Sequence, residues 1–299
     1  MARRIRLPRR RTLVIALCWA IVASLTAFYV LNPIMSVRRY THPLRSVVDV
    51  PPPAGAEDVA FATRDGLALR GWYIPAQNRA AIVLVHGIDA NRGQMAGVAA
   101  TLAARGYGVL LFDVRAHGAS DGDRLVFGAE EAEDVLGAVT FLQARPDVDP
   151  ERIGALGFSL GAGMVLLGGA RSSALRAVVA DGPGFTAEED FPPPASWREW
   201  LYVPYDAVFF RALAAQTGVA HPQSLRTAVT AIAPRPVLFI CGARSSTECH
   251  RVRTFYDLAG EPKALWEIPD AGHIQGSALH PEEYTQRISG FFEEALLRR

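Results

Sequence analysis

The first 48 residues of this 299-residue chain contain no acidic side chain, although they contain nine arginines. The remaining 22 basic residues are outnumbered by the 30 acidic ones, so residues 49–299 carry a net charge of −8. Because nucleic-acid-binding domains are typically basic, this balance argues against a nucleic-acid partner. Lysine is almost absent as well, and its single occurrence, Lys263, indicates the compositional bias of a GC-rich genome rather than a chemical role.

Cysteine is also scarce, with three residues in the chain. Cys18 lies in an apolar segment, whereas Cys241 and Cys249 flank the end of a predicted strand and could either form a disulfide or remain thiols. The sequence has no His-Glu-x-x-His motif and no paired-cysteine motif, and its seven histidines are scattered. This pattern argues against a zinc site, and we expect neither a metal nor an organic cofactor.

Charge is missing from residues 12–37, and the apolar run over residues 12–31 would form a helix about 30 Å long, enough to span a bilayer. The alternative is a cleaved signal peptide, whose apolar region is usually shorter and ends in small residues, whereas this run ends in "FYVLNP". We therefore expect residues 1–37 to be a retained anchor. Six arginines before the run and three after it predict a cytoplasmic N-terminus, with the rest of the chain outside.

Residues 38–56 are basic and then proline-rich, which is typical of a linker. After it, two short alternating runs joined by Asp65-Gly66 predict a β-hairpin, and apolar strands then alternate with helices. Residues 57–299 are therefore predicted to be one α/β domain with a mostly parallel sheet covered on both faces. An aromatic-rich insertion at about residues 183–233 interrupts this alternation. It is either a lid over the sheet edge where such folds bind ligands, or a helical excursion without contact to substrate.

The stretch "GFSLG", residues 157–161, follows the predicted strand "RIGAL" and begins a predicted helix. A G-x-S-x-G pattern in a strand–turn–helix context is typical of a nucleophilic serine held on a sharp turn, with glycines where a side chain would collide. The helix N-terminus beneath the serine offers free N–H groups. This context favours Ser159 as a nucleophile over a small residue in an ordinary turn.

Four motifs together resemble those of the α/β-hydrolase fold, in the serine-hydrolase branch that includes esterases, thioesterases and related peptidases. They are "HGI" at 86–88, "DVRAHGAS" at 113–120, "GFSLG" at 157–161 and "PDAGH" at 269–273. The resemblance covers about 80% of the chain and implies an eight-stranded, mostly parallel sheet with a helical lid. It implies further that His273, in the loop after the last strand, is the base that activates Ser159.

The same resemblance assigns the oxyanion hole to the backbone N–H groups of Leu160 and Ile88. His86 is expected to orient the loop that carries Ile88. Two other histidines compete with the base. His117 belongs to the motif after the fourth strand and is expected to shape a turn, and His280 precedes "PEEY" and is expected to start a helix.

The third catalytic residue of this family, an acid that orients the histidine, is where the sequence departs from the family's pattern. Members commonly carry Gly-x-x-Asp after the penultimate strand, but this chain has Ser245 at the aspartate position. Glu248, three residues further on, can still orient the histidine, because the role needs a carboxylate rather than one particular stem length. The alternative is Asp181, at the end of the strand "LRAVVAD". The sequence favours Glu248 and leaves both open.

We therefore predict a serine hydrolase anchored in a bacterial cytoplasmic membrane, with its catalytic domain outside, that cleaves a carboxylic ester or a thioester of a small acyl substrate. Trp197, Trp200 and Tyr202 of the insertion are candidate substrate contacts. The sequence leaves two alternatives and an undefined oligomeric state. One is a short-peptide peptidase with an acid of "AEED" (187–190) binding the amino terminus, although these acids are expected to be a solvated helix start. The other is a catalytically silent binding domain of the same fold.

Overall fold

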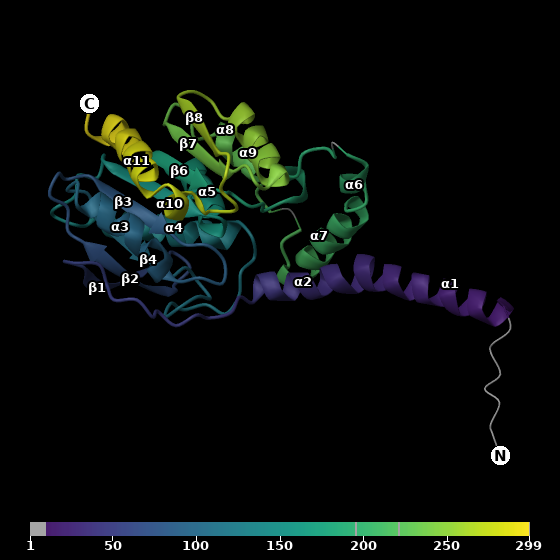
Figure 1. The fold of residues 1–299 in the computed structure, drawn as a ribbon. Helices are drawn as coiled ribbons and strands as arrows, with labels where there is room; N and C mark the ends of the chain where they lie inside the picture. The colour runs from purple at the N-terminus through teal and green to yellow at the C-terminus, as the bar shows by residue number, and fades with distance from the viewer. Residues whose placement is uncertain (1–9, 195, 221, 299) are drawn as a thin grey trace, which may run out of the picture. The chain divides into compact units, whose positions relative to one another are not determined.

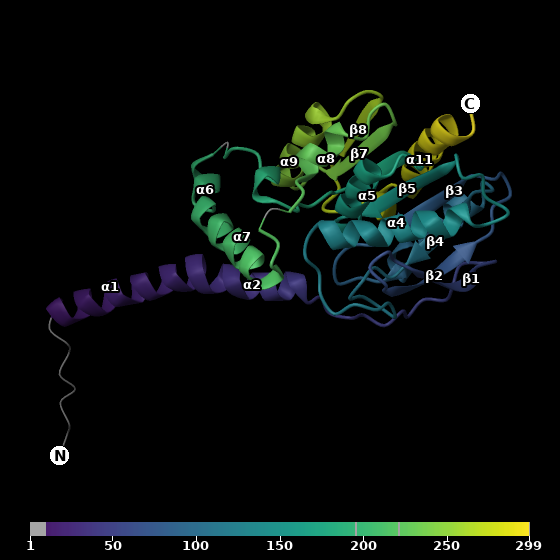
Figure 2. The same cartoon turned by 180° about the vertical axis from the view of Figure 1, so that it is seen from behind.

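The computed structural model describes residues 10–194, 196–220 and 222–298 (Figures 1 and 2). The chain divides into two compact units. The larger unit contains Tyr40–Pro193 and Val219–Arg299, and the smaller unit contains Met1–Arg39 and Pro194–Gly218. Residues 1–9 of the predicted basic segment lie outside the described residues. Each unit is described below by itself.

The larger unit is built on one eight-stranded sheet, as predicted, in the order β1-β2-β4-β3-β5-β6-β7-β8. Strands β1 and β2 form the predicted antiparallel hairpin, β2 runs antiparallel to β4, and all further pairings are parallel. The strands are β1 Glu57–Ala62, β2 Ala68–Ile74, β3 Ala81–Val85, β4 Gly108–Phe112, β5 Ile153–Phe158, β6 Leu175–Asp181, β7 Val237–Gly242 and β8 Lys263–Ile268.

Helices cover both faces of this sheet, which explains why its central strands are continuous apolar runs. Figure 1 shows one face with α3 and α11, and Figure 2 shows the opposite face with α4, α5, α8 and α9. Successive residues of β3 alternate between the two cores, so Ile82 and Leu84 pack with the α11 side, whereas Val83 and Val85 pack with the α5 side. These helices are α3 Ala96–Ala103, α4 Ala129–Gln143, α5 Leu160–Arg171, α8 Leu225–Thr230, α9 Ser246–Leu258 and α11 Pro281–Leu296.

The parallel strands all end at the same edge of the sheet. The loops after β3, β5, β6, β7 and β8 therefore converge there, and they carry most of the residues singled out from the sequence. Three short elements belong to these loops: η2 Arg92–Met95, η3 Glu188–Asp190 and α10 Gly276–Leu279.

The smaller unit contains one long N-terminal helix and two helices of the insertion. The segments α1 Arg10–Thr26, η1 Ala27–Leu31 and α2 Asn32–Thr41 form a 32-residue helix, the one helix in the described part of the chain that is long and apolar enough to cross a membrane. Its middle segment is a π-helical turn just before Pro33, whose ring nitrogen has no N–H to continue the α-helical pattern.

The insertion contributes α6 Trp197–Trp200 and α7 Val203–Thr217 to this unit. The ring of Phe28 lies 6.1 Å from that of Tyr202 and 5.8 Å from that of Tyr205, and the Tyr205 hydroxyl donates to Asn32 Oδ1 at 3.1 Å. The aromatic-rich part of the insertion is therefore packed on the end of the apolar helix, a contact that the sequence pattern did not predict.

Candidate active site

Ser159 occupies a strained turn between β5 and α5. Its φ of 54° lies in the left-handed region, which non-glycine residues rarely adopt. Both flanking glycines are required by close backbone contacts. A Cβ at Gly157 would lie 2.1 Å from the carbonyl oxygen of Gly161, and a Cβ at Gly161 would lie 2.3 Å from that of Val85. The Ser159 N–H donates to the Asp181 carbonyl at 2.9 Å, so the turn is also tied to β6.

The structure brings Ser159, His273 and Glu248 into one hydrogen-bonded chain. Ser159 Oγ lies 2.8 Å from His273 Nε2, and His273 Nδ1 lies 2.7 Å from Glu248 Oε2. The three residues come from three different segments at the carboxyl edge of the sheet: the β5–α5 turn, the loop after β8 and the first turn of α9. Glu248 is buried, whereas the side chain of His273 is 45% exposed, so a substrate can reach its ring.

Glu248 is held in place by contacts to both of its oxygens. Its second oxygen, Oε1, accepts a hydrogen bond from the Gly242 N–H at 3.1 Å. Because it lies in the first turn of the 13-residue helix α9, the free N–H groups and dipole of that helix end favour its negative charge.

Asp181, the alternative acid, has a different partner. It is the last residue of β6, is buried, and accepts a hydrogen bond from the Tyr284 hydroxyl of α11 at 2.9 Å. Burial raises the pKa of the Asp181 carboxyl to about 7. The Tyr284 hydrogen bond and the charge of His273 act in the opposite direction, whereas the charge of Glu248 adds to the rise. The geometry therefore gives the histidine contact to Glu248 and a tyrosine contact to Asp181.

The two backbone groups assigned to the oxyanion hole from the sequence lie at the start of α5 and in the loop after β3. Leu160 is the first residue of α5, so its N–H has no acceptor within the helix. Ile88 follows His86 and Gly87 in the loop after β3. The Nδ1 of His86 lies 2.7 Å from the Gly87 carbonyl, and its Nε2 accepts the Val114 N–H at 3.1 Å. Burial, helped by the nearby His117, lowers the pKa of His86 to about 3, so this ring is neutral.

The other two histidines are bound away from Ser159. His117 Nε2 accepts the Asp89 N–H at 3.2 Å, and its Nδ1 lies 2.9 Å from the Arg115 carbonyl, so it braces the loop that carries Ile88. Burial lowers the pKa of His117. His280 is the N-cap residue of α11 and its Nε2 lies 2.7 Å from Asp270 Oδ1.

Two features of the site were not assigned from the sequence. Arg115, of the motif "DVRAHGAS", is buried and donates to Asp134 Oδ1 at 2.7 Å and to Asp65 Oδ2 at 2.8 Å, which fixes the loop after β4. The signal available in the sequence was an arginine in the same short motif as Asp113 and His117. Cys241 and Cys249, left open above, form a disulfide.

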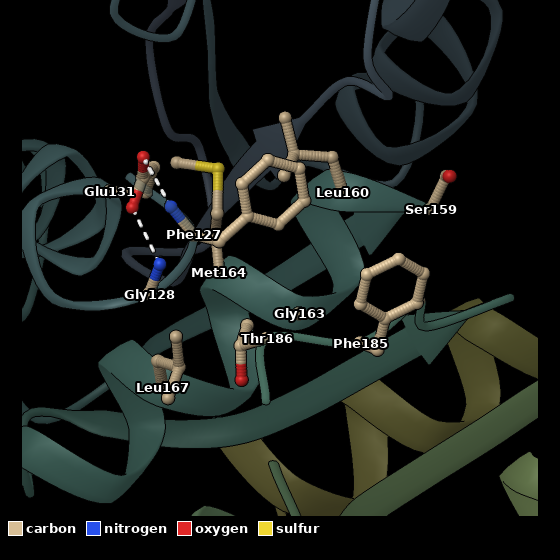
Figure 3. Close-up of a pocket in the computed structure, with 11 residues that line it drawn as sticks. Phe127, Gly128, Glu131, Ser159, Leu160, Gly163, Met164, Leu167, Phe185 and Thr186 are labelled. Atoms are coloured by element: carbon tan, nitrogen blue, oxygen red, sulfur yellow. Dashed lines mark hydrogen bonds between the residues drawn. The ribbon is translucent and has the colours of Figure 1, made fainter. Parts of the chain in front are cut away.

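A small pocket opens beside Ser159 on the α5 side (Figure 3). Its wall is mostly apolar. Glu131, the one charged residue in the wall, accepts the N–H groups of Phe127 and Gly128 with its two oxygens. Its carboxylate therefore holds the loop before α4. The lining residues are Phe127, Gly128, Glu131, Ser159, Leu160, Gly163, Met164, Leu167, Gly184, Phe185 and Thr186.

The predicted residues of the insertion are in two different environments. Trp197, Trp200 and Tyr202 are exposed and belong to the smaller unit. Asp190 corrects the expectation of a solvated "AEED" segment. It is fully buried, and its carboxylate accepts the Thr186 N–H at 2.7 Å and the Arg226 N–H at 3.1 Å. It therefore ties the start of the insertion to its end.

Comparisons with known proteins agree with this fold. A family model described as serine aminopeptidase, S33, matches residues 76–231, just over half of the chain. Uncharacterized protein YfhR of Escherichia coli K12 is 28% identical over 258 residues, covering 82% of this chain and 84% of that protein. Thiohydrolase apmlB of Arthrinium phaeospermum is 35% identical over 150 residues, covering 49% and 48%.

Among solved structures, the esterase Pf2001 of Pyrococcus furiosus superposes with a TM-score of 0.70 at 27% identity, covering 86% of this chain and 98% of that one. The α/β-hydrolase fold predicted from the four motifs is thereby confirmed, and the protein is a hydrolase of that type. The chain belongs to the serine aminopeptidase S33 family of α/β-hydrolases.

Proposed function

We propose that the protein is a serine hydrolase that cleaves a carboxylic ester through an acyl-enzyme on Ser159. The observation that carries this proposal is the hydrogen-bonded chain from Ser159 Oγ through the two nitrogens of His273 to Glu248, at 2.8 and 2.7 Å. A serine hydroxyl is a poor nucleophile by itself and needs an adjacent base, which must in turn be oriented by a third group. All three roles have a residue at hydrogen-bond distance.

The reaction proceeds in two halves. His273 Nε2 takes the Ser159 proton as Oγ attacks the carbonyl carbon, and Glu248 stabilises the imidazolium through Nδ1. The backbone N–H groups of Leu160 and Ile88 stabilise the negative oxygen of the tetrahedral intermediate. His273 then returns the proton to the leaving oxygen, or to the sulfur of a thioester. A water molecule, deprotonated by the same ring, attacks the acyl-enzyme and releases the acid.

The acyl group is proposed to occupy the pocket beside Ser159. Its wall is formed mainly by apolar side chains such as Phe127, Met164, Leu167 and Phe185, and the pocket is small, so we expect a short apolar chain rather than a long one. The names of similar proteins, an esterase and a thiohydrolase, support acyl transfer to water. The exposed Trp197, Trp200 and Tyr202 stay as predicted contacts to the rest of the substrate.

The second candidate is a short-peptide peptidase, which the name of the family model favours. Such an enzyme needs a group that binds the amino terminus of its substrate. Asp190 is unsuited to this role, because it is buried and its oxygens accept N–H and hydroxyl groups of the chain itself. Glu188 and Glu189 are then the acids of this stretch that could bind the amino terminus. Because the buried acid is unsuited to that role, we place the peptidase second to the esterase.

The long N-terminal helix is proposed to anchor the enzyme in a bacterial cytoplasmic membrane, with the larger unit outside. The apolar side chains of α1 are exposed along its length, and arginine dominates the predicted cytoplasmic end. The Cys241–Cys249 disulfide supports an oxidising compartment. Protease treatment of intact spheroplasts tests this topology, because it should digest the larger unit and spare the cytoplasmic end.

The test of the reaction is labelling by a fluorophosphonate together with hydrolysis of a series of p-nitrophenyl esters and aminoacyl p-nitroanilides. We expect wild type to be labelled and to prefer short-chain esters. Ser159→Ala should lose both activities. His273→Ala should lose them too, whereas His280→Ala, which removes a half-buried histidine paired with Asp270 instead, should retain them. Faster cleavage of the anilides would favour the peptidase. A folded wild type that is neither labelled nor active would favour a silent binding domain.

A further inference from the structure

The loop that carries the acid is where this chain departs from the pattern of its family. The expected aspartate position is Ser245, the N-cap residue of α9. The acid lies instead on the first turn of that helix, six residues after Gly242. A glutamate there has a longer side chain than an aspartate and one more rotatable bond, so more conformational freedom must be removed before its carboxylate stays on His273.

Two adjacent residues at the end of β7 tether this turn. The Gly242 N–H donates to Glu248 Oε1 at 3.1 Å, which fixes the carboxylate itself. The preceding residue, Cys241, is bonded to Cys249, the neighbour of Glu248, with the two Cα atoms 5.4 Å apart. The backbone on the far side of Glu248 is thus held covalently to the strand from which the hydrogen bond comes.

The disulfide lies within the packed part of the unit rather than on its surface. Cys241 is 0% and Cys249 is 2% exposed, and both belong to the core on the α5 side of the sheet. The same core buries Val252 and Phe255 of α9, which hold the later turns of the helix. The first turn, where Glu248 lies, is joined to the end of β7 by the disulfide and the Gly242 hydrogen bond, and the N-cap residue before it, Ser245, donates its N–H to the Gly242 carbonyl at 3.2 Å.

We propose that the Cys241–Cys249 disulfide is a positioning element of the active site, which keeps the displaced acid Glu248 against His273. The proposal rests on the proposed serine-hydrolase function. Without the bond, the first turn of α9 can move away from Gly242, and the Glu248 carboxylate leaves His273 Nδ1 for part of the time. The loss then falls on turnover, because the acid acts on the histidine in the chemical step and not on the bound substrate.

The test compares the full chain with a Cys241→Ala/Cys249→Val variant, whose alanine and valine together replace the volume of the two sulfur atoms with apolar groups. We expect kcat for a short p-nitrophenyl ester to fall about 10- to 100-fold with KM unchanged. Cys18→Ser, which removes the free cysteine of the N-terminal helix, should leave kcat at the wild-type value. In a Glu248→Ala background, the same cysteine pair should cost no further activity, because its effect acts through that carboxylate.

Reduction of the unaltered chain is a second measurement that changes no side chain other than the disulfide. Dithiothreitol supplies two electrons and two protons, the S–S bond breaks into two thiols, and the reagent becomes a cyclic disulfide. Because both sulfurs are buried, reduction is done in mild urea that is then removed, and circular dichroism checks the fold. Reduced enzyme should show the low kcat and recover on reoxidation.

Several outcomes would overturn the proposal while leaving the enzyme itself intact. They are a wild type with three thiols that react with maleimide, a cysteine-pair variant with wild-type kcat, and an equal fold loss in the wild-type and Glu248→Ala backgrounds. The last outcome would mean that the bond only stabilises the fold. If wild type itself is neither labelled by fluorophosphonate nor active, the proposed function fails instead, and the two failures are distinguishable.

Discussion

Two buried carboxylates lie at the ends of neighbouring strands and behave differently. Glu248, after β7, accepts the Gly242 N–H, contacts His273 and lies in the first turn of a helix. Asp181, at the end of β6, accepts one neutral hydroxyl, from Tyr284, and its pKa is raised to about 7, chiefly by burial. Two acids in one region thus have separate roles that their environments decide.

The difference explains why the less conventional residue is the better candidate for the acid. The role needs a negative charge that stabilises the imidazolium during the reaction. A carboxyl whose pKa is raised to about 7 carries less of that charge at neutral pH than an ordinary carboxylate does. The position of Asp181 at a strand end would have qualified it on sequence grounds, but its carboxylate accepts a hydrogen bond from the Tyr284 hydroxyl, whereas Glu248 is the acid at hydrogen-bond distance from His273.

The largest expected effect separates the two acids directly. Glu248→Gln keeps the size of the side chain and removes its charge, so kcat for a short p-nitrophenyl ester should fall about 10³- to 10⁴-fold. Asp181→Asn keeps an acceptor for Tyr284 and should stay within about fivefold of wild type. Steady-state kinetics on both variants checks the pair. The reverse ranking would reassign the acid to Asp181.

A shorter acid sharpens the comparison at an intermediate scale. Glu248→Asp keeps the charge but shortens the stem, so one carboxylate can no longer satisfy both the Gly242 N–H and His273 Nδ1. We expect kcat to fall about 10- to 100-fold, less than for the uncharged glutamine, with KM unchanged. A fall as deep as that of Glu248→Gln would mean that reach, and not charge, decides the contribution of this residue.

Much of this site could be predicted from the sequence because the motifs lie at strand ends. Ser159 in "GFSLG" and His273 in the loop after "ALWEIP" each follow a strand that can be recognised from the sequence, so their positions in the fold can be predicted from neighbouring residues alone. The choice between Glu248 and Asp181 could not be made in this way. Both follow adjacent strands, and the difference is set by Tyr284 of α11, more than 30 residues beyond Glu248 and joined to Asp181 only in the folded chain.

Other features escaped the sequence for the same reason. The Cys241–Cys249 bond depends on the first turn of α9 folding back on the end of β7. Asp190 looked solvated because it stands among acids, yet it is buried by residues 34 and 36 positions away, Ser224 and Arg226. The packing of Tyr205 on Phe28 joins segments with no shared motif. Periodicity and motifs report local order, and long-range polar contacts leave no pattern in them.

The third prediction concerns the pH dependence of stability. The pKa of Asp181 is about 7 when folded and about 4 when unfolded. Between these values the folded state holds a proton that the unfolded state has released, so the free energy of unfolding of wild type should fall as pH rises through this window. Asp181→Asn does not titrate, so its stability relative to wild type should rise between pH 4 and pH 7 by up to a few kcal/mol. Urea unfolding at pH 4.5 and pH 8 measures it. A constant difference between the two proteins would show that Asp181 is ionised throughout.

The smallest expected effect tests what the Tyr284 hydroxyl contributes. Tyr284→Phe leaves Asp181 without its donor, so it should cost about 1–2 kcal/mol in the free energy of unfolding while kcat stays within about twofold. Tyr107→Phe is the matched control, because the Tyr107 hydroxyl is also buried but has no hydrogen-bond partner among the described residues. Its removal should be neutral or slightly stabilising, since it abolishes an unsatisfied polar group. Equal costs for the two variants would show that the loss is one of packing, and a large fall in kcat for Tyr284→Phe would draw Asp181 back into the catalytic chain.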